Sequence, residues 1–282
     1  MKILITGING QVGSVLSHQA KAQGHEVVAL GREQWDMAQS PEQGEALVLQ
    51  SEPNLVINLA AYTNVDDAEE DEATALKVNA DAPRSLAKAC QQLDIPLFHI
   101  STDYVFDGAK KKPYVETDST NPINVYGRTK LAGELAVQEE TDKYIIIRTS
   151  WVFSKDGKNF VNTILRLVQE RDELKVVNDQ LGGPTSAECI AAVLLQLAFR
   201  HNEQWGIYHY SGQPFVSWFE FAATIIQIKY ENYMPKLIPC ASGEFQAKAV
   251  RPKNSSLSNA RMASNFEIYP CQWKNFIHSY YL

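Results

Sequence analysis

The chain has few of the features that mark secreted, membrane or metal-cluster proteins. Its four cysteines are far apart and form no CxxC pair, which argues against a zinc cluster and against a disulfide-stapled scaffold. The six histidines lack the i, i+4 spacing of a helical metal-binding pair. The longest apolar runs, such as "YIIIR", are far shorter than the roughly 20 residues that a membrane span needs. We therefore expect reduced thiols, no metal site and no membrane partner.

Positive charge is scarce as well. The 282 residues carry a formal net charge of -7, which gives no electrostatic footprint for nucleic acid, and the "KKK" cluster at 110–112 is too short to change that. No internal repeat and no low-complexity segment interrupts the chain. The N-terminal "MKILITG" lacks the long apolar core and the small-residue cleavage site of a signal peptide. These features predict a globular, cytoplasmic protein without a nucleic-acid partner.

Short apolar runs alternate with segments of helical periodicity through the first half of the chain. The runs are "KILIT", "EVVAL", "LVINL", "LFHIS" and "YIIIR". Continuous apolar strands are typical of a parallel sheet that is covered by helices on both faces. The pattern predicts an α/β fold with a doubly wound, Rossmann-type parallel sheet. We expect residues 1–148 to form a dinucleotide-binding domain, to which a helix at 186–200 returns, and residues 149–282 to form mainly a smaller substrate-binding lobe.

The first predicted strand, residues 2–6, runs directly into "GINGQVG". This segment places Gly7, Gly10 and Gly13 before a helical stretch at 12–23. Glycines at such a turn let the backbone turn tightly and approach a pyrophosphate, whose charge then lies at the helix N-terminus. The GxxGxxG spacing is also compatible with a tight strand-to-helix turn alone. Its place after the first strand and before a helix favours dinucleotide binding.

Arg32 follows the second predicted strand, and Asp36 lies four residues further on. An Arg at this place can pair with the 2′-phosphate of NADPH, whereas an acidic residue directly at the strand end would favour the free 2′-hydroxyl of NADH. The residues favour NADPH slightly. A solvent-exposed loop cation is the alternative interpretation of Arg32.

The acidic run "VDDAEEDE" at 65–72 suggests a metal ion or a basic partner at first sight. Carboxylates are also stabilised in the opening turns of a helix by the helix dipole, while they point to water. We therefore expect most of these side chains to open a helix.

Tyr126 and Lys130 are four residues apart in "NVYGRTKLAGE", at a predicted helix start. This spacing puts both side chains on one face, where the ammonium would lower the pKa of the phenol from about 10. Such a tyrosine donates a proton near neutral pH. Upstream, "HISTDYVFDG" places Ser101, Thr102 and Asp103 at the C-terminal end of a predicted strand, where ligands gather in open parallel sheets. The hydroxyl of Thr102 would there hold the substrate oxygen that Tyr126 protonates.

Together these motifs resemble the extended short-chain dehydrogenase/reductase family, whose members combine a TGxxGxxG turn, a YxxxK helix and an upstream Ser or Thr. The segments "AAYTNVDDAE", "VNA", "STDYVFDG", "RTSWVF", "NDQLGGPT" and "RPKNSSL" resemble the branch of this family that completes dTDP-L-rhamnose. The resemblance extends from the first strand to around residue 260. It implies that NADPH or NADH transfers a hydride to the C4 ketone of dTDP-4-dehydro-L-rhamnose, a nucleotide sugar for polysaccharide biosynthesis.

The resemblance also implies roles for individual residues. Tyr126 would protonate the alkoxide, Lys130 would lower the tyrosine pKa and hold the nicotinamide ribose, and Thr102 would align the ketone. The cofactor-binding residues would be Gly7, Asn9, Gly10, Gln11, Val12, Arg32, Asp36, Met37, Ala60, Ala61, Tyr62, Asn79, Tyr126 and Lys130. The substrate-binding residues would be Thr63, Val65, Thr102, Asp103, Tyr104, Phe106, Trp151, Asn178, Gln180 and Arg251.

Physical arguments support two of these substrate residues. Arg251 has the side chain for a bidentate contact to a diphosphate, with a surface salt bridge as the alternative. Trp151 follows a predicted strand and is suited to pack on a sugar or thymine ring, with core packing as the alternative.

The chain departs from the family pattern in two places. Some members are dimers joined through a magnesium ion held by glutamates, and this chain has Val15 where one such glutamate is expected, although Glu188 is present. We therefore expect no Mg²⁺ bridge, and a homodimer is possible without it. The run "FQAKAVRP" replaces the usual Thr-Pro-Ala before Arg-Pro, which leaves the choice between a dTDP and a UDP sugar open.

Two other functions fit the same motifs. One is a reductase or epimerase that acts on another nucleotide sugar. The other is a dinucleotide-binding regulatory subunit without catalysis, like the non-catalytic subunit of methionine adenosyltransferase. The complete set of Thr102, Tyr126 and Lys130 favours an enzyme, and Tyr104 directly after Asp103 argues against a 4,6-dehydratase.

Overall fold

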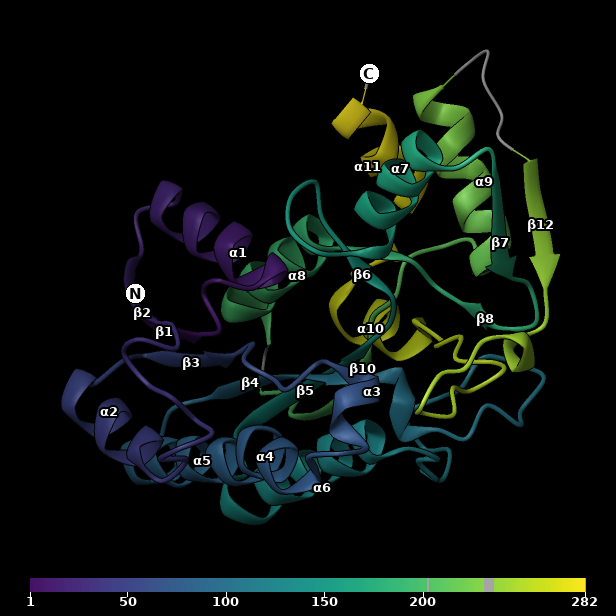
Figure 1. The fold of residues 1–282 in the computed structure, drawn as a ribbon. Coiled ribbons are helices and arrows are strands. Elements are labelled where there is room, and N and C mark those ends of the chain that lie inside the picture. The colour runs from purple at the N-terminus through teal and green to yellow at the C-terminus, as the bar shows by residue number, and fades with distance from the viewer. Residues whose placement is uncertain (202, 231–235, 282) are drawn as a thin grey trace.

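The computed structural model describes residues 1–201, 203–230 and 236–281 (Figure 1). Its strands are β1 (Lys2–Thr6), β2 (Glu26–Leu30), β3 (Leu55–Asn58), β4 (Leu97–Thr102), β5 (Tyr144–Thr149), β6 (Val152–Phe153), β7 (Glu173–Val177), β8 (Leu181–Gly182), β9 (Thr185–Ser186), β10 (Gly206–His209), β11 (Val216–Ser217) and β12 (Lys236–Cys240). Its main helices are α1 (Gln11–Ala22), α2 (Gln43–Ser51), α3 (Val65–Ala68), α4 (Glu72–Leu76), α5 (Ala82–Leu93), α6 (Val125–Glu140), α7 (Phe160–Glu170), α8 (Ala187–Arg200), α9 (Trp218–Lys229), α10 (Ala260–Phe266) and α11 (Trp273–Tyr281).

A six-stranded sheet forms the centre of the molecule. Its strand order is β10-β5-β4-β3-β1-β2, and every pair of neighbours is parallel. The order reverses between β1 and β3, the position at which open α/β sheets bind ligands outside the carboxyl ends of their strands. The predicted doubly wound parallel sheet is confirmed, and the five apolar runs form β1 to β5.

The apolar strands are continuous because both faces of the sheet are covered (Figure 1). Successive side chains point to opposite faces. Ile3 and Ile5 of β1 pack in the core beneath α1 and α8, whereas Leu4 packs in the core shared with α2 and α5. Ile146 of β5 likewise faces the α2 and α5 side, while its two neighbours face the other.

A smaller lobe follows β5 in the chain and lies beside the sheet. It contains α7, α9, α11 and the parallel pair β7–β12, around a core that includes Phe153, Phe221 and Trp273 (Figure 1). The chain returns from this lobe to the sheet, where α8 packs on α1 and β10 pairs with β5. The division into domains at residue 148 stays a prediction.

No helix among the described residues combines the length and the hydropathy that a bilayer crossing requires. The cysteines, all within the described ranges, are free thiols.

Candidate active site

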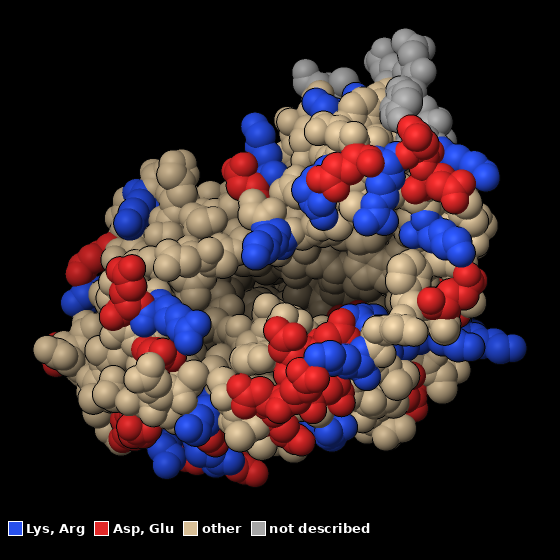
Figure 2. All heavy atoms as spheres, viewed as in Figure 1, with Lys and Arg blue, Asp and Glu red and all other residues tan. Residues whose placement is uncertain are grey.

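A cleft of about 1010 Å³ opens between the carboxyl ends of the central strands and the smaller lobe. Figure 2 shows it as a deep hollow in the face of the molecule. Its walls come from the turn after β1, the ends of β2 to β5, the start of α6, and the segment that joins β5 to α7. Segments that are distant in the sequence therefore meet at one site.

The turn after β1 brings backbone close to backbone. Gly7 has φ +68°, and a Cβ atom there would lie 2.7 Å from the amide nitrogen of Ala60. A Cβ atom at Gly13 would lie 2.1 Å from the carbonyl oxygen of Gly7, so α1 packs tightly on the turn. The hydroxyl of Thr6 accepts hydrogen bonds from the amides of Leu59 and Ala60, which ties the end of β1 to the segment after β3.

The far end of the cleft is formed by residues after β2. The guanidinium of Arg32 is 81% exposed and lies 3.4 Å from the carboxylate of Asp36. Burial opposes ionisation of Asp36, but the amide of Ala38 and the charge of Arg32 outweigh it and lower the pKa of this carboxyl. Arg32 therefore lies at the rim of the cleft, largely exposed to solvent and paired with Asp36.

Tyr126 and Lys130 lie on the first turns of α6, which begins because the side chain of Asn124 accepts the amide of Gly127 at 2.8 Å. Lys130 is only 2% exposed, and its ammonium donates to the carbonyl of Ile100 at the end of β4 at 2.8 Å. Burial lowers the pKa of Lys130 to about 8. The helix thus mounts an ammonium and a phenol at the base of the cleft.

The pKa of Tyr126 shifts in the direction opposite to the expected one. Burial raises it to about 12, and a hydrogen bond with the hydroxyl of Thr102 only partly offsets this effect. The expected lowering by Lys130 is not seen, because its ammonium is held at the carbonyl of Ile100. In the free protein the phenol is therefore protonated over the whole neutral range.

A buried ion pair lies beneath this pair of residues. Arg148 of β5 donates to both carboxylate oxygens of Glu134 of α6, at 2.9 and 2.6 Å, and the two side chains are 3% and 0% exposed. The hydroxyl of Ser101 also donates to Glu134. Because Glu134 is already neutralised by Arg148, the charge of Lys130 has no full counter-charge nearby.

The end of β4 supplies two adjacent polar side chains to the cleft. The hydroxyl of Thr102 donates to Asp103 at 3.1 Å and accepts the amide of Tyr104 at 3.2 Å. Burial raises the pKa of Asp103 to about 6, against the lowering effect of its hydrogen bonds. These two bonds hold the hydroxyl of Thr102, which also lies within hydrogen-bond reach of Tyr126.

Most of the predicted site residues line this one cleft. The predicted cofactor residues among its walls are Gly7, Asn9, Gly10, Gln11, Val12, Arg32, Asp36, Met37, Ala60, Ala61, Tyr62, Tyr126 and Lys130. The predicted substrate residues among its walls are Thr63, Val65, Thr102, Asp103, Tyr104 and Trp151.

Three further predicted residues, each with a side-chain amide, are not among the residues that line the cleft. Asn79 accepts the backbone amide of Tyr62 at 2.8 Å, and Gln180 accepts the indole N–H of Trp218 at 3.2 Å. Asn178 accepts the hydroxyl of Ser217, the residue before Trp218, at 2.7 Å. Asn79 and Gln180 thus hold residues that line the cleft, and Asn178 holds the neighbour of one.

Two further predicted substrate residues have other partners in this structure. Phe106 is fully buried and stacks on Tyr114, with the ring centroids 4.2 Å apart. Arg251 makes an ion pair with Asp66, at 2.8 Å between Nη2 and Oδ2. Arg251 thus forms the salt bridge that was the alternative interpretation of this residue.

Trp151 is held in a strained position at the cleft wall. Its φ of +47° lies in the left-handed region, which is costly for a bulky residue. Its ring stacks on Trp218 at a centroid distance of 3.5 Å and an angle of 7°. A Cβ atom at Gly182 would lie 2.4 Å from the same indole. Glycine is required at 182 for this packing, and Trp218, which sequence reasoning missed, is a second aromatic wall.

Sequence reasoning also missed the loop at 154–159 between β6 and α7. Lys155 and Lys158 from this loop line the cleft. The available signal was "SKDGKN", a polar, glycine-containing connection that follows two short apolar segments.

The acidic run opens α3 and α4, as expected. Asn64 and Asp71 cap these helices, and the exposed carboxylates that follow lie in their first turns. Asp66 and Glu70 pair with Arg251 and Lys248 of the C-terminal lobe. Part of the run therefore ties α3 to the loop at 248–251.

No cluster of three or more His, Cys, Asp or Glu side chains suited to a metal ion occurs within residues 1–201, 203–230 and 236–281. Glu188 accepts a hydrogen bond from the hydroxyl of Tyr280.

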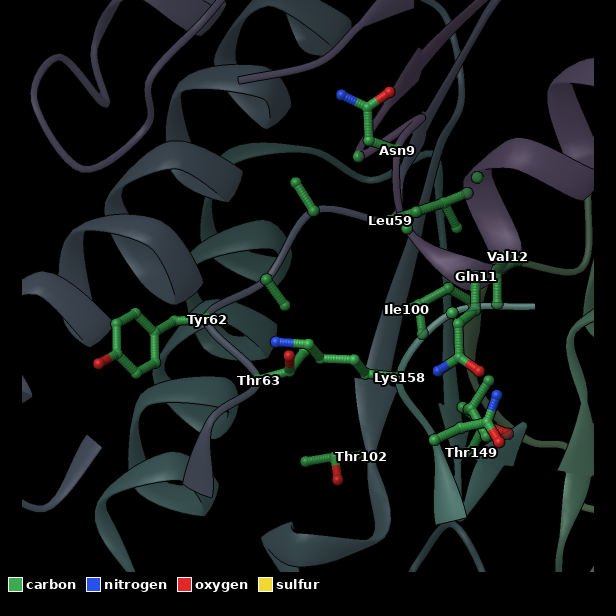
Figure 3. A pocket seen from close by; sticks show the side chains of 18 of the residues that line it. Asn9, Gln11, Val12, Leu59, Tyr62, Thr63, Ile100, Thr102, Thr149 and Lys158 are labelled. Atoms are coloured by element: carbon green, nitrogen blue, oxygen red, sulfur yellow. The ribbon is translucent and has the colours of Figure 1, made fainter. Parts of the chain in front are cut away.

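The cleft suits a dinucleotide in three respects. The glycine turn leaves no room for side chains and presents backbone amides at the start of α1. The volume is at the upper end of the range for small-molecule sites. The buried hydroxyl of Thr149, shown in Figure 3, has no hydrogen-bond partner among the described residues and faces the cleft.

Known proteins resemble the whole chain. A family model described as "RmlD substrate binding domain" matches residues 1–281. A dTDP-4-dehydrorhamnose reductase of Sinorhizobium fredii is 40% identical over 281 residues, which cover 97% of this chain and 94% of the relative. A protein of the same name from Burkholderia thailandensis is 42% identical over 287 residues, covering 97% and 96%.

Solved structures are similar as well. A dTDP-4-dehydrorhamnose reductase from Clostridium acetobutylicum has a TM-score of 0.93 and 39% identity, covering 99% of this chain and 98% of that chain. The Bacillus anthracis protein of that name, in complex with NADP, has a TM-score of 0.92 and 36% identity, with the same coverage.

Proposed function

Since the chain belongs to the RmlD substrate binding domain family, we propose that it is a dTDP-4-dehydrorhamnose reductase. It reduces the C4 ketone of dTDP-4-dehydro-L-rhamnose to dTDP-L-rhamnose, the last step of dTDP-rhamnose biosynthesis. The observation that carries the proposal is the convergence of Thr102, Tyr126 and Lys130 at the base of a cleft that also holds the glycine turn. A binding module without chemistry has no need for a buried phenol beside a buried ammonium.

The reaction adds a hydride and a proton to a ketone, and the bound nicotinamide cofactor supplies the hydride. Tyr126 supplies the proton, because burial holds its pKa at about 12 and keeps the phenol protonated near neutral pH. Thr102 lies beside Tyr126, and its hydroxyl, which donates to Asp103 in this structure, would turn to hold the oxygen that accepts this proton. Lys130 lies one turn further along α6, where its ammonium can hold the ribose hydroxyls next to the nicotinamide.

The two sets of cleft residues divide the ligands between them. The turn at 7–12, the segment at 60–62 and the rim around Arg32 bind the dinucleotide, while Thr63, Val65, Asp103, Tyr104 and Trp151 bind the nucleotide sugar. Residues 1–148, with α8 and β10, form the cofactor domain, and the remainder forms mainly the sugar-nucleotide lobe. Arg32 favours NADPH, because its guanidinium is exposed at the rim and suits a 2′-phosphate.

The oxidation of NADPH and of NADH, followed at the nicotinamide absorbance, tests the proposal. dTDP-4-dehydro-L-rhamnose is generated in situ, and a UDP-linked keto sugar is the comparison. Rapid oxidation with the dTDP sugar establishes the reaction, the substrate and the preferred cofactor together. Cofactor binding without oxidation of either sugar would refute the assigned reaction and would favour another nucleotide sugar or a regulatory subunit.

A cytoplasmic homodimer without a bridging metal completes the proposal. The first helix has Val15 in place of an acid, and the hydroxyl of Tyr280 already occupies Glu188. Light scattering after size-exclusion chromatography, with and without EDTA, should give the same dimer mass. A monomer would contradict the oligomeric state, and dissociation by EDTA would contradict the absence of a metal bridge.

A further inference from the structure

The loop at 154–159 lines the cleft next to the glycine turn. It leaves the smaller lobe after β6, and the hydroxyl of Ser154 donates to the side chain of Gln11, the first residue of α1, at 2.8 Å. The loop is thereby fastened to the segment that approaches the cofactor. In sequence the loop belongs to the proposed sugar-binding lobe, but in the folded protein it contacts the proposed cofactor domain.

Hydrogen bonds within residues 154–162 also stabilise the backbone of the loop. The side-chain amide of Asn159 donates to the carbonyl of Ser154 at 2.9 Å. The side-chain amide of Asn162, in the first turn of α7, donates to the carbonyls of Lys155 and Gly157 at 3.0 and 2.9 Å. These bonds fix the backbone, so that the side chains of the loop start from defined positions.

Lys158 projects from this loop into the cleft. Its side chain is exposed to solvent, and Figure 3 shows it directed away from the loop and across the pocket. Within the described part of the chain no carboxylate lies within ion-pair distance of its ammonium. A lysine held over a cleft without a counter-charge is in a position to meet an anionic ligand.

Lys155 of the same loop also lines the cleft, whereas the cations from other segments differ from Lys158 in position or in partners. Arg32 stands at the outer rim beside Asp36, and Lys130 is buried with its ammonium on the carbonyl of Ile100. Asp and Glu side chains gather along the rim formed by α3 and α4, as Figure 2 shows. A diphosphate that enters past this acidic rim, in a protein of net charge -7, requires local positive charge in the cleft.

We propose that Lys158 binds a diphosphate in the cleft, as a charged donor supplied by the β6–α7 loop. This inference rests on the proposed function, because both of its ligands carry a diphosphate: the nicotinamide dinucleotide and the dTDP sugar. Lysine binds phosphate oxygens as a compact point charge with three donors. The contact crosses from the smaller lobe to the ligand and joins the two walls of the cleft through it.

The test compares the purified full-length protein with Lys158→Gln, Lys158→Arg and a matched control, Lys111→Gln. Lys111 is also exposed and changes the net charge equally, but it does not line the cleft. Dissociation constants are measured by titration calorimetry with NADPH in one arm and with dTDP, at saturating NADPH, in the other. Lys158→Gln should weaken binding about tenfold in one arm, because a hydrogen bond to a charged group is lost. The affected arm identifies which diphosphate Lys158 holds.

Two further readouts separate a charge contact from a structural effect. Lys158→Arg should retain the affinity to within about threefold. The loss of affinity in Lys158→Gln should shrink as the salt concentration rises from about 0.05 to about 0.5 M, because screening weakens exposed charge pairs. A Lys158→Gln protein that matches Lys111→Gln in both arms would overturn the proposal, and so would a loss that salt leaves unchanged. Wild-type protein that binds both probes but does not reduce the sugar would refute the proposed reaction while leaving the lysine result valid.

Discussion

Replacing Lys130 by Met should stabilise the folded protein while it removes activity. The ammonium of Lys130 is 2% exposed, and its attraction to Glu134 is weakened because Arg148 already neutralises that carboxylate. Burial therefore dominates, and it lowers the pKa of Lys130 from 10.5 to about 8. Met fills a similar volume without a charge, so the substitution removes the cost of burying an ammonium.

The size of the effect follows from the pKa shift. About 2.5 pKa units correspond to about 3 kcal/mol at 1.36 kcal/mol per unit. Loss of the hydrogen bond to the carbonyl of Ile100 destabilises the variant by about 1 kcal/mol, so the net stabilisation is about 2 kcal/mol at pH 7. For a chain of 282 residues this raises Tm by about 3 °C.

The difference in the free energy of unfolding between Lys130→Met and the wild type changes sign with pH. The folded-state pKa of Lys130 lies below the unfolded value, so between about pH 8 and 10.5 the unfolded chain holds a proton that the folded chain has lost. The free energy of unfolding of the wild type therefore rises through this window, and the advantage of Lys130→Met disappears. Above it the variant should be less stable by about 1 kcal/mol, the value of the lost hydrogen bond.

Urea unfolding at pH 7 and pH 10 measures both parts of the prediction, with the exposed Lys88→Met as control. The activity assay on the same samples should show little or no turnover for Lys130→Met. A variant that is less stable than the wild type at pH 7, or a stability difference that does not change with pH, would refute the assignment of a buried, poorly compensated ammonium.

Three other substitutions test the site and its support. Tyr126→Phe should lower turnover by a factor on the order of a hundred or more and leave the Kd of NADPH within about twofold, since only the proton donor is lost; equal turnover would exclude its role. Glu134→Gln should cost about 3 kcal/mol in urea unfolding, because it leaves the guanidinium of Arg148 buried without its counter-charge. A cost below about 1 kcal/mol would show that the pair contributes little. Gly182→Ala should displace Trp151, whose indole lies 2.4 Å from the added Cβ atom, and raise KM for the nucleotide sugar while the Kd of NADPH stays constant; an unchanged KM would remove Trp151 from the sugar site.

The sheet was predictable because its signal is local. A strand buried on both faces favours a nearly continuous run of apolar side chains, and the runs from "KILIT" to "YIIIR" show this pattern within a few residues. The same holds for the glycine turn and for the spacing of Tyr126 and Lys130, where the helical repeat alone puts two side chains on one face.

The electrostatics of the pair could not be predicted in the same way. Spacing indicates that Lys130 is near Tyr126, but the sequence does not show that both are buried or that Ile100 takes the ammonium. The pKa of Tyr126 follows desolvation, which depends on the whole cleft. Trp218 and Lys158 were missed for a related reason: the smaller lobe brings them to the cleft from far along the chain, and neither belongs to a motif.

Features that lower the stability of the folded protein are concentrated along the cleft. Away from ligand positions, buried charge is paired, as in Arg148 and Glu134. Along the cleft, Lys130 has no full counter-charge, Trp151 has a left-handed backbone, and the hydroxyl of Thr149 has no partner among the described residues. Such features persist only where the surrounding packing enforces them. A ligand that brings polar groups to Lys130 and Thr149 would give these side chains further partners, so binding would offset part of the free energy that their burial costs in folding. The stabilisation expected for Lys130→Met is the direct measure of that cost, because it removes one of these features and leaves the others in place.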